Sequence, residues 1–187
     1  MAYNPEYLVR YRAAAACYKP DVVQLLILGE SPPPPRGGVI RYFYFKELSF
    51  PENLYHGVIK AVIGDNYDSS SSAKPGNLSH LKANGLFLID AIEYSFYDIP
   101  DSQKISALKS ARKDVLDRIR ALNPQGVIIV HPRVHNAVSG YLQKNGVSIL
   151  NTNPIDFPST KDQRIMNGFV RDFRQSAGSI ITLPLQV

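Results

Sequence analysis

Four polar side chains stand at or just beyond the ends of apolar runs, and they are the first candidates for chemistry. They are Glu30 after Val22–Leu28, Asp90 within Leu86–Ile92, His131 after Val127–Val130 and Asn153 after Val147–Leu150. Carboxylates and imidazoles exchange protons with reacting groups, and an amide donates hydrogen bonds to developing negative charge. A carboxylate among apolar residues needs partners or a raised pKa, so Asp90 is either a site residue or a hydrogen-bonded structural one. His131 is either functional or a capping residue.

The elements that must position these residues are strands and helices in alternation. The four runs above and Ile180–Leu183 are short and nearly continuous, which is typical of strands buried on both faces of a parallel sheet. Helical spacing of apolar residues predicts helices at Tyr7–Tyr18, Leu54–Ile63, Gln103–Leu122, Val134–Lys144 and Asp162–Gln175. Asp101 or Ser102 can cap the third of these. The pattern predicts a three-layer α/β/α fold with a mostly parallel sheet of four or five strands, whose ligands bind beyond the carboxyl ends of the strands.

The length of 187 residues is that of a single α/β domain spanning residues 1–187. Gly64–Ser79 carries four consecutive serines and predicts a mobile loop, about 64–80, inside this domain. The single cysteine, Cys17, excludes an internal disulfide and an all-cysteine metal site, and no phosphate-loop, dinucleotide or zinc motif is present, so we expect no metal and no cofactor. Met1–Tyr18 has no secretory pattern, and no run approaches the roughly 18 apolar residues of a membrane helix. We therefore expect a cytoplasmic protein without membrane contact.

The charge balance points to possible partners. Lysine and arginine total 21 against 16 acidic residues, which gives a net charge of +5 and a pI near 9.3. A basic surface favours polyanionic partners such as DNA, although the same charge could serve solubility alone. The oligomeric state is left open.

Two segments after the first strand could build a binding wall. Glu30 is followed by Ser31 and the prolines Pro32–Pro35, which form either a rigid wall or an interaction motif. Four consecutive aromatic residues then follow Arg41, and among them Phe43 or Tyr44 could stack on a flat base. The alternative is a core strand with alternate rings buried, and both can hold because alternate residues face opposite ways.

The loop after the fourth run has the character of a nucleic-acid contact. In Asn151–Thr160 an apolar residue, Ile155 or Phe157, could insert into a stacked duplex. Hydroxyls and cations around it could hold phosphates. The candidates for nucleic-acid contact are these two apolar residues together with Ser159, Lys161, Arg164, Arg36, Arg41 and Arg133. Basic residues on an ordinary solvated helix face are the alternative for some of them.

From Val22 to about Gln175, the order of these motifs resembles that of the uracil-DNA glycosylase superfamily. The sequence GESPP resembles the GEAPG of its iron–sulfur branch, and FLIDAIEY resembles the strand that ends in a base-reading asparagine. The aromatic run lies where the family has its base-stacking ring, nearest Phe43 or Tyr44. The late NPIDFPS resembles the HPSP loop, with a start closer to the NPSG of the mismatch-specific branch.

The resemblance implies hydrolysis of the N-glycosidic bond of a flipped, damaged or mispaired base in DNA. Glu30 would position water and stabilise an oxocarbenium-like sugar, while Asn153 would donate to a base oxygen. Phe43 or Tyr44 would stack the base, with Ser31 beside it, and Asp90 would read its edge. Cysteines for an iron–sulfur cluster are absent.

Asp90 departs from the family pattern, because an ionised aspartate only accepts hydrogen bonds where asparagine also donates. Either Asp90 is protonated in an apolar pocket, or the substrate is not uracil and carries an exocyclic amino group. Two other functions remain open. One is a catalytically inactive protein of the same fold that binds nucleic acid or a nucleobase-like ligand, and the other is a hydrolase of a small nucleoside with Glu30 and Asp90 as its acid–base pair.

Overall fold

Seven helices and three strands make up the part of the chain that the computed structural model describes, residues 4–47 and 52–185. The strands are β1 (Leu25–Gly29), β2 (Leu86–Asp90) and β3 (Gly126–Ile129). The helices are α1 (Pro5–Cys17), α2 (Asn53–Ile63), α3 (Lys74–Ala83), α4 (Asp101–Ser110), α5 (Arg112–Leu122), α6 (Pro132–Lys144) and α7 (Gln163–Ala177). The predicted α/β class is confirmed.

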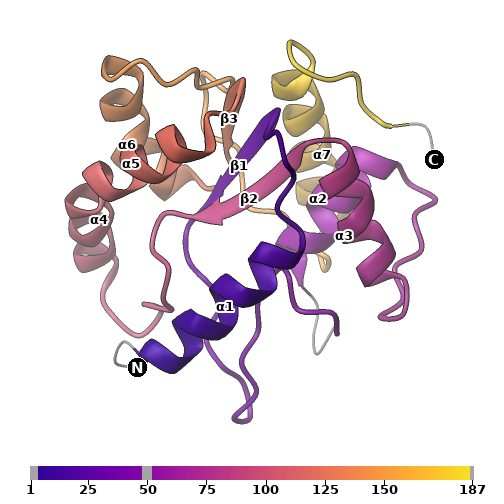
Figure 1. The fold of residues 1–187 in the computed structure, drawn as a ribbon, viewed down its shortest axis with the longest axis horizontal. Helices are drawn as coiled ribbons and strands as arrows, with labels where there is room; N and C mark the ends of the chain where they lie inside the picture. The colour runs from indigo at the N-terminus through magenta and orange to yellow at the C-terminus, as the bar shows by residue number, and fades with distance from the viewer. Residues whose placement is uncertain (1–3, 48–51, 186–187) are drawn as a thin grey trace.

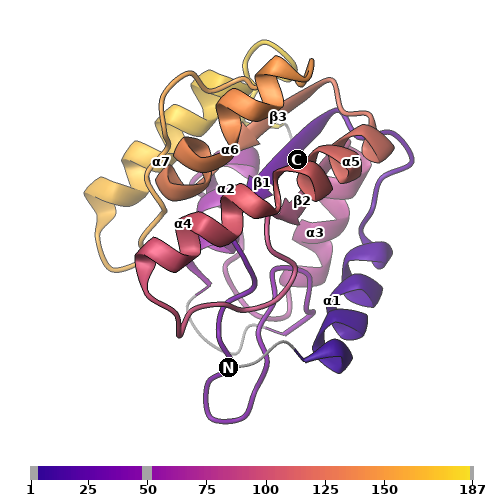
Figure 2. The same cartoon turned by 90° about the vertical axis from the view of Figure 1, so that its left-hand side faces the viewer.

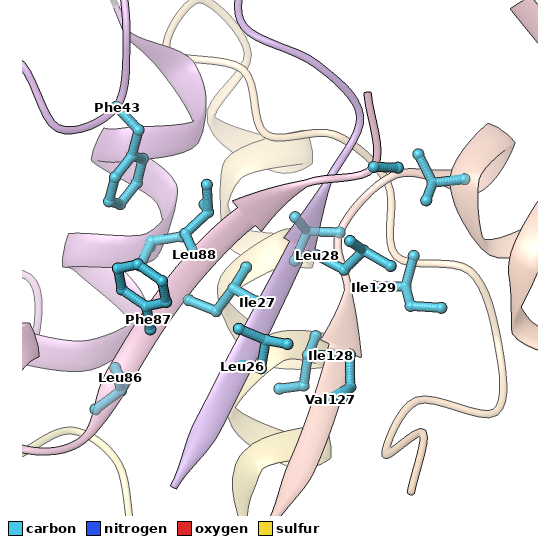
Figure 3. Close-up of a cluster of buried hydrophobic side chains, with 14 of the residues drawn as sticks. Leu26, Ile27, Leu28, Phe43, Leu86, Phe87, Leu88, Val127, Ile128 and Ile129 are labelled. Carbon is cyan, nitrogen blue, oxygen red and sulfur yellow. The ribbon is translucent and has the colours of Figure 1, made fainter. Parts of the chain in front are cut away.

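The strands form one parallel sheet in the order β2-β1-β3. All residues of β1 and β3 are buried, which explains why these runs are apolar throughout instead of alternating. Gly29 pairs with Asp90, and Leu28 pairs with Ile129, so the carboxyl ends of the three strands lie at one edge of the sheet. Figure 3 shows the side chains of the three strands interleaved in the core.

Helices cover both sides of this sheet. Figure 1 shows α4, α5 and α6 on one side and α2, α3 and α7 on the other, and in Figure 2 the first group faces the viewer. The α2–α7 contact is close because Gly57 has no side chain, and an added Cβ would lie 2.9 Å from the ring of Phe169. None of the helices in the described ranges is long and apolar enough to cross a membrane.

The sheet has fewer strands than the four or five expected. Residues 147–150 approach β3 and form a single bridge, with Val127 N–H donating to Ser148 O at 2.8 Å and Leu150 N–H donating to Val127 O at 2.9 Å. At Ile129, the next outward-facing position of β3, the hydrogen-bonding partner is a side chain and no longer the main chain of a neighbouring segment. Asn151 Oδ1 accepts from Ile129 N–H at 2.9 Å and its Nδ2 donates to Ile129 O at 3.2 Å, so the ladder ends there.

Three other expectations about local structure were wrong. Residues 180–183 form no strand, because a turn at the end of α7 leads the chain to α2, where Leu185 N–H donates to Val62 O at 2.7 Å. The expected helix 103–122 is two helices, α4 and α5, which meet at Ala111. Neither Asp101 nor Ser102 caps α4, since its N-cap is Pro100 and both residues lie inside the helix.

The expected loop 64–80 is also shorter than predicted. The serine-rich stretch ends where α3 begins at Lys74, with Pro75 in the first turn, a position that tolerates proline because its missing N–H has no helical partner. Leu78 and Leu81 bury the inner face of α3. Polar composition therefore concealed a helix that is held by two apolar residues and a buried lysine.

Candidate functional site

A cleft of about 330 Å³ opens at the carboxyl ends of the strands. The predicted site residues that line it are Glu30, Ser31, Arg41, Phe43, Asp90 and Phe157. Residues from elsewhere in the chain complete it, among them Glu52, Asn53, Tyr55, Tyr97 and His131. Segments far apart in sequence thus converge on one concave surface, where α/β folds place their ligands.

Glu30 directly follows β1 and is held by a cation. Its Oε1 lies 2.6 Å from Nη1 of Arg133, whose Nη2 lies 3.1 Å from Asp101 Oδ1. The other carboxylate oxygen, Oε2, lies 3.9 Å from Nε2 of His131. The side chain is only 10% exposed. Arg133, a candidate for nucleic-acid contact, orients this carboxylate and leaves Oε2 facing the histidine.

Asp90 ends β2 next to Gly29, and that glycine makes room for it. A Cβ at residue 29 would lie 2.5 Å from Asp90 Oδ1, so any other residue there would displace the carboxyl group. Asp90 is 7% exposed, and over residues 4–47 and 52–185 its carboxyl group makes no hydrogen bond. Burial raises its pKa to about 7, which the nearby Arg118 partly opposes and the charges of Glu30 and Glu93 reinforce. Near neutral pH, Asp90 therefore exists in both protonation states.

His131 has two functions in the structure. As the N-cap of α6, its Nδ1 accepts a hydrogen bond from Arg133 N–H at 3.1 Å. Because Nδ1 is an acceptor, the neutral ring carries its proton on Nε2, the atom that faces Glu30. Burial lowers the pKa of His131, although Glu30 opposes this shift, so the ring is a neutral N–H donor at the cleft. The capping alternative considered for this residue is therefore correct without excluding a functional one.

The aromatic run divides between cleft and core. Phe43 lines the cleft, as does Leu88 of β2. Tyr44 does not line it: its ring is buried, and its hydroxyl accepts from Leu88 N–H at 2.6 Å and donates to Leu88 O at 3.2 Å. Of the two base-stacking candidates, only Phe43 is at the site.

The late loop does not bring all of its expected residues to the cleft. Asn153 is exposed and lines a separate cavity beside α7, together with Arg171. Ile155 is 2% exposed and belongs to the core, so it cannot insert into a duplex. Phe157 is 40% exposed at the edge of the cleft, with its ring 5.7 Å from that of His131. Among the expected apolar residues, Phe157 alone is available to a ligand.

The same loop is attached firmly to α2. Thr160 donates to Asn53 Oδ1 from both its N–H, at 3.1 Å, and its hydroxyl, at 2.8 Å. Pro158 fits against Gly57, where an added Cβ would come within 2.8 Å of its ring. Beyond this contact Lys161 and Arg164 are exposed, and Ser159 Oγ accepts from Lys161 N–H at 3.3 Å. Ser159, Lys161 and Arg164 therefore follow shortly after Phe157 in the chain, the residue of this loop that lines the cleft.

The remaining predicted residues have separate positions. Ser31 lies in the wall of the cleft, and its hydroxyl donates to Pro32 O at 3.3 Å. Arg41 also lines the cleft, where its guanidinium donates to Pro34 O at 3.1 and 3.2 Å and so fixes the proline segment. This favours the rigid-wall interpretation of the prolines. Arg36 is exposed in a turn that pairs with Val39 and does not line the cleft.

Sequence reasoning missed a buried ion pair behind the cleft. Glu52, in the cleft wall, pairs with Lys74 of α3, whose side chain is 0% exposed and whose Nζ lies 4.9 Å from the centre of the Tyr55 ring. Burial raises the pKa of Glu52 and lowers that of Lys74, and the attraction between the two charges opposes both shifts. The position of Glu52 just before an apolar helix could have indicated a functional residue. Lys74 lies in the serine-rich stretch, where nothing in the sequence suggested that a lysine would be buried.

This arrangement suits a flat polar ligand. Three carboxyl groups, a neutral imidazole and a guanidinium line a cleft that also has aromatic side chains in its walls. Within the described ranges no cluster of three or more histidine, cysteine, aspartate or glutamate side chains could hold a metal ion. The side chains can accept a proton at Glu30, donate hydrogen bonds at His131, and both donate and accept at Asp90, depending on its protonation.

Comparisons with known proteins add no relative to this description. No family model matches the chain, and none of the curated proteins matches it significantly. What the protein does must therefore be inferred from the chemistry of the cleft.

Proposed function

We propose that this protein hydrolyses the N-glycosidic bond of a flipped, damaged or mispaired base in DNA. The observation that carries the proposal is the convergence of Glu30, Phe43, Asp90 and His131 on one cleft. A base outside the duplex needs an aromatic face to stack on, polar groups along its edge and a carboxylate beside its sugar. The cleft has all three.

The reaction assigns one role to each group. As the bond between the base and C1′ breaks, its electron pair leaves with the base and positive charge develops on the sugar. Glu30 stabilises that charge and takes a proton from the water whose oxygen attacks C1′. Nε2–H of His131 donates to the departing base, a task that the resemblance gave to Asn153. Arg133 keeps Glu30 in place throughout.

We further propose that the fold is the three-layer α/β/α arrangement of the uracil-DNA glycosylase superfamily. The parallel order β2-β1-β3, the single bridge from residues 147–150 and the helices on both sides of the sheet support this assignment. The positions of Glu30 and Asp90 after β1 and at the end of β2 agree with the motifs that suggested it.

DNA is the partner that the surroundings of the cleft favour. Phe157 at its edge can enter the space that a flipped nucleotide leaves in the duplex. Lys161 and Arg164 stand exposed beyond it and can contact phosphates, which the net charge of +5 reinforces.

The test is an assay with duplex oligonucleotides that contain uracil, hypoxanthine, xanthine, mispaired thymine or a modified cytosine, followed by alkaline cleavage at abasic sites. We expect strand breaks for at least one lesion, and a loss of about 10²-fold or more in Glu30→Gln. Asp156→Gln, a change at an exposed carboxylate of the same late loop, is the control and should retain activity. If the wild-type protein binds DNA and releases no base from any of the substrates, the proposal is wrong.

The Glu30–Arg133 ion pair favours a second candidate function. A guanidinium at 2.6 Å occupies one oxygen of the Glu30 carboxylate, and such a fixed ion pair suits a protein that binds a nucleobase without cleaving it. This alternative predicts that both the wild type and Glu30→Gln bind a base or DNA, and that neither gives abasic product. The same assay, run with a binding measurement on both proteins, separates the two functions.

A further inference from the structure

The hydrogen-bonding character of the cleft indicates which base it would accept. Two of its acidic side chains, Glu30 and Glu52, have cations as partners, Arg133 and Lys74. Both carboxylate residues line the cleft, whereas neither of these two cations does. The walls therefore present acceptors at these carboxylates, beside the donors of Arg41 and His131.

Asp90 differs from these two because its carboxyl group makes no hydrogen bond within residues 4–47 and 52–185, although it is more than nine-tenths buried. Arg118, a nearby cation, donates instead to the main-chain oxygens of Asp90 and Ala91, at 2.8 and 2.9 Å. A buried polar group without a partner costs free energy, and a ligand that supplies the partner recovers it. Asp90 lines the cleft, so this partner can come from the bound molecule.

We propose that the cleft selects a planar base that presents an exocyclic amino group, of the cytosine or adenine type, over the carbonyl edge of uracil. Amino N–H groups match the acceptors of Asp90 and Glu52, whereas the O4 atom of uracil would be repelled by the oxygen of ionised Asp90. Phe43 and Tyr55 supply the aromatic surface on which such a base stacks. The inference rests on the proposed function only in placing a base in this cleft, and it adds the class of base.

The test is isothermal titration calorimetry with three nucleosides of similar size. Cytidine has the amino group, uridine has a carbonyl group in its place, and N4,N4-dimethylcytidine has the cytosine ring without its N–H donors. We expect cytidine to bind about tenfold more tightly than either of the others, since one hydrogen bond to a carboxylate is gained and one repulsion is avoided. Equal binding of cytidine and uridine, tighter binding of uridine, or binding of none of the three overturns the inference.

The pH dependence provides a second readout. Asp90 faces Arg118 from α5, Glu30 after β1, Glu93 after β2, and the tyrosines at positions 11, 42 and 44. Ionisation of Asp90 strengthens its acceptor character, so cytidine should bind more tightly at about pH 8 than at about pH 6, and uridine less tightly. Asp90→Asn should remove both trends and reduce the preference, whereas Asp21→Asn, at an exposed carboxylate before β1, should keep them.

These outcomes are separable from those of the glycosylase assay because nucleoside binding needs no bond cleavage. A preference for cytidine without release of any base from DNA would contradict the proposed hydrolysis and support the inference. Release of uracil from DNA with no preference for cytidine would support the proposed hydrolysis and contradict the inference about the class of base.

Discussion

Nη1 of Arg133 lies 2.6 Å from Oε1 of Glu30, although 103 residues separate them in the sequence. The same guanidinium reaches Asp101 at the start of α4, so one arginine at the first turn of α6 connects the end of β1 with a third segment. The orientation of the candidate catalytic carboxylate thus depends on a residue whose sequence position suggested only contact with DNA.

Arg133→Met should lower the free energy of unfolding by about 1–2 kcal/mol, because the largely buried Glu30 carboxylate loses its partner. Chemical denaturation at neutral pH measures this difference. Arg164→Met, a change of the same kind at the exposed start of α7, is the matched control and should stay within about 0.5 kcal/mol of the wild type. Equal effects of the two substitutions would show that the ion pair contributes no stability.

Gly29→Ala should disturb the site directly. The added methyl group would lie 2.5 Å from Asp90 Oδ1, so the carboxyl group must move, and we expect a loss of about 1–3 kcal/mol in stability together with weaker nucleoside binding. Gly76→Ala in α3 is the control. No atom lies within 4 Å of its added Cβ, and alanine favours helix by about 1 kcal/mol, so thermal unfolding should show equal or higher stability.

The raised pKa of Asp90 predicts how stability changes with pH. The folded protein holds the Asp90 proton up to about pH 7, whereas the unfolded chain releases it near the usual aspartate value of 3.8. The stabilisation from this protonated group is complete below the unfolded pKa and is lost as the pH rises through about 7. Asp90→Asn should therefore gain stability relative to the wild type between about pH 4 and pH 8, by up to about 4 kcal/mol.

Denaturation curves of the wild type and Asp90→Asn at several pH values in this window measure the relative gain. The exposed Asp21→Asn serves as the reference for loss of one carboxylate. A constant difference between Asp90→Asn and the wild type across the window would mean that Asp90 is not protonated in the folded protein.

The buried Glu52–Lys74 pair should respond asymmetrically to substitution. Lys74→Met leaves a buried carboxylate without its partner and should cost about 3 kcal/mol or more. In the double variant with Glu52→Gln the uncompensated charge is absent, so part of the stability should return, and urea denaturation of the four proteins of this cycle gives the coupling energy. A double variant that is only as stable as the sum of the single changes predicts would exclude coupling.

The sequence was sufficient to predict the elements whose pattern is local and strongly apolar. The runs of β1, β2 and β3 became buried parallel strands, and the placement of Glu30 and Asp90 at their ends followed from that arrangement alone. Phe43 could be named as one of two candidates, because alternation along the aromatic run places neighbouring rings on opposite sides.

What could not be predicted depends on contacts between distant segments. Whether residues 147–150 form a strand is decided by the Asn151 side chain, which occupies the hydrogen-bonding groups of Ile129. Lys74 is buried because Glu52 and the Tyr55 ring stand opposite it, which a serine-rich segment gave no reason to expect. Ile155 and Phe157 are two residues apart, and only tertiary packing buries one and exposes the other.

On each outer strand of the sheet, a side chain occupies both main-chain hydrogen-bonding groups of one residue. The Tyr44 hydroxyl occupies the N–H and the carbonyl oxygen of Leu88 in β2, as the Asn151 amide does for Ile129 in β3. Exposed strand edges invite pairing with another chain, and a residue whose two groups are already bonded cannot join such a ladder. At these two positions the outer strands cannot accept another chain, and at β3 the bridge from residues 147–150 adds to this protection against edge-to-edge aggregation.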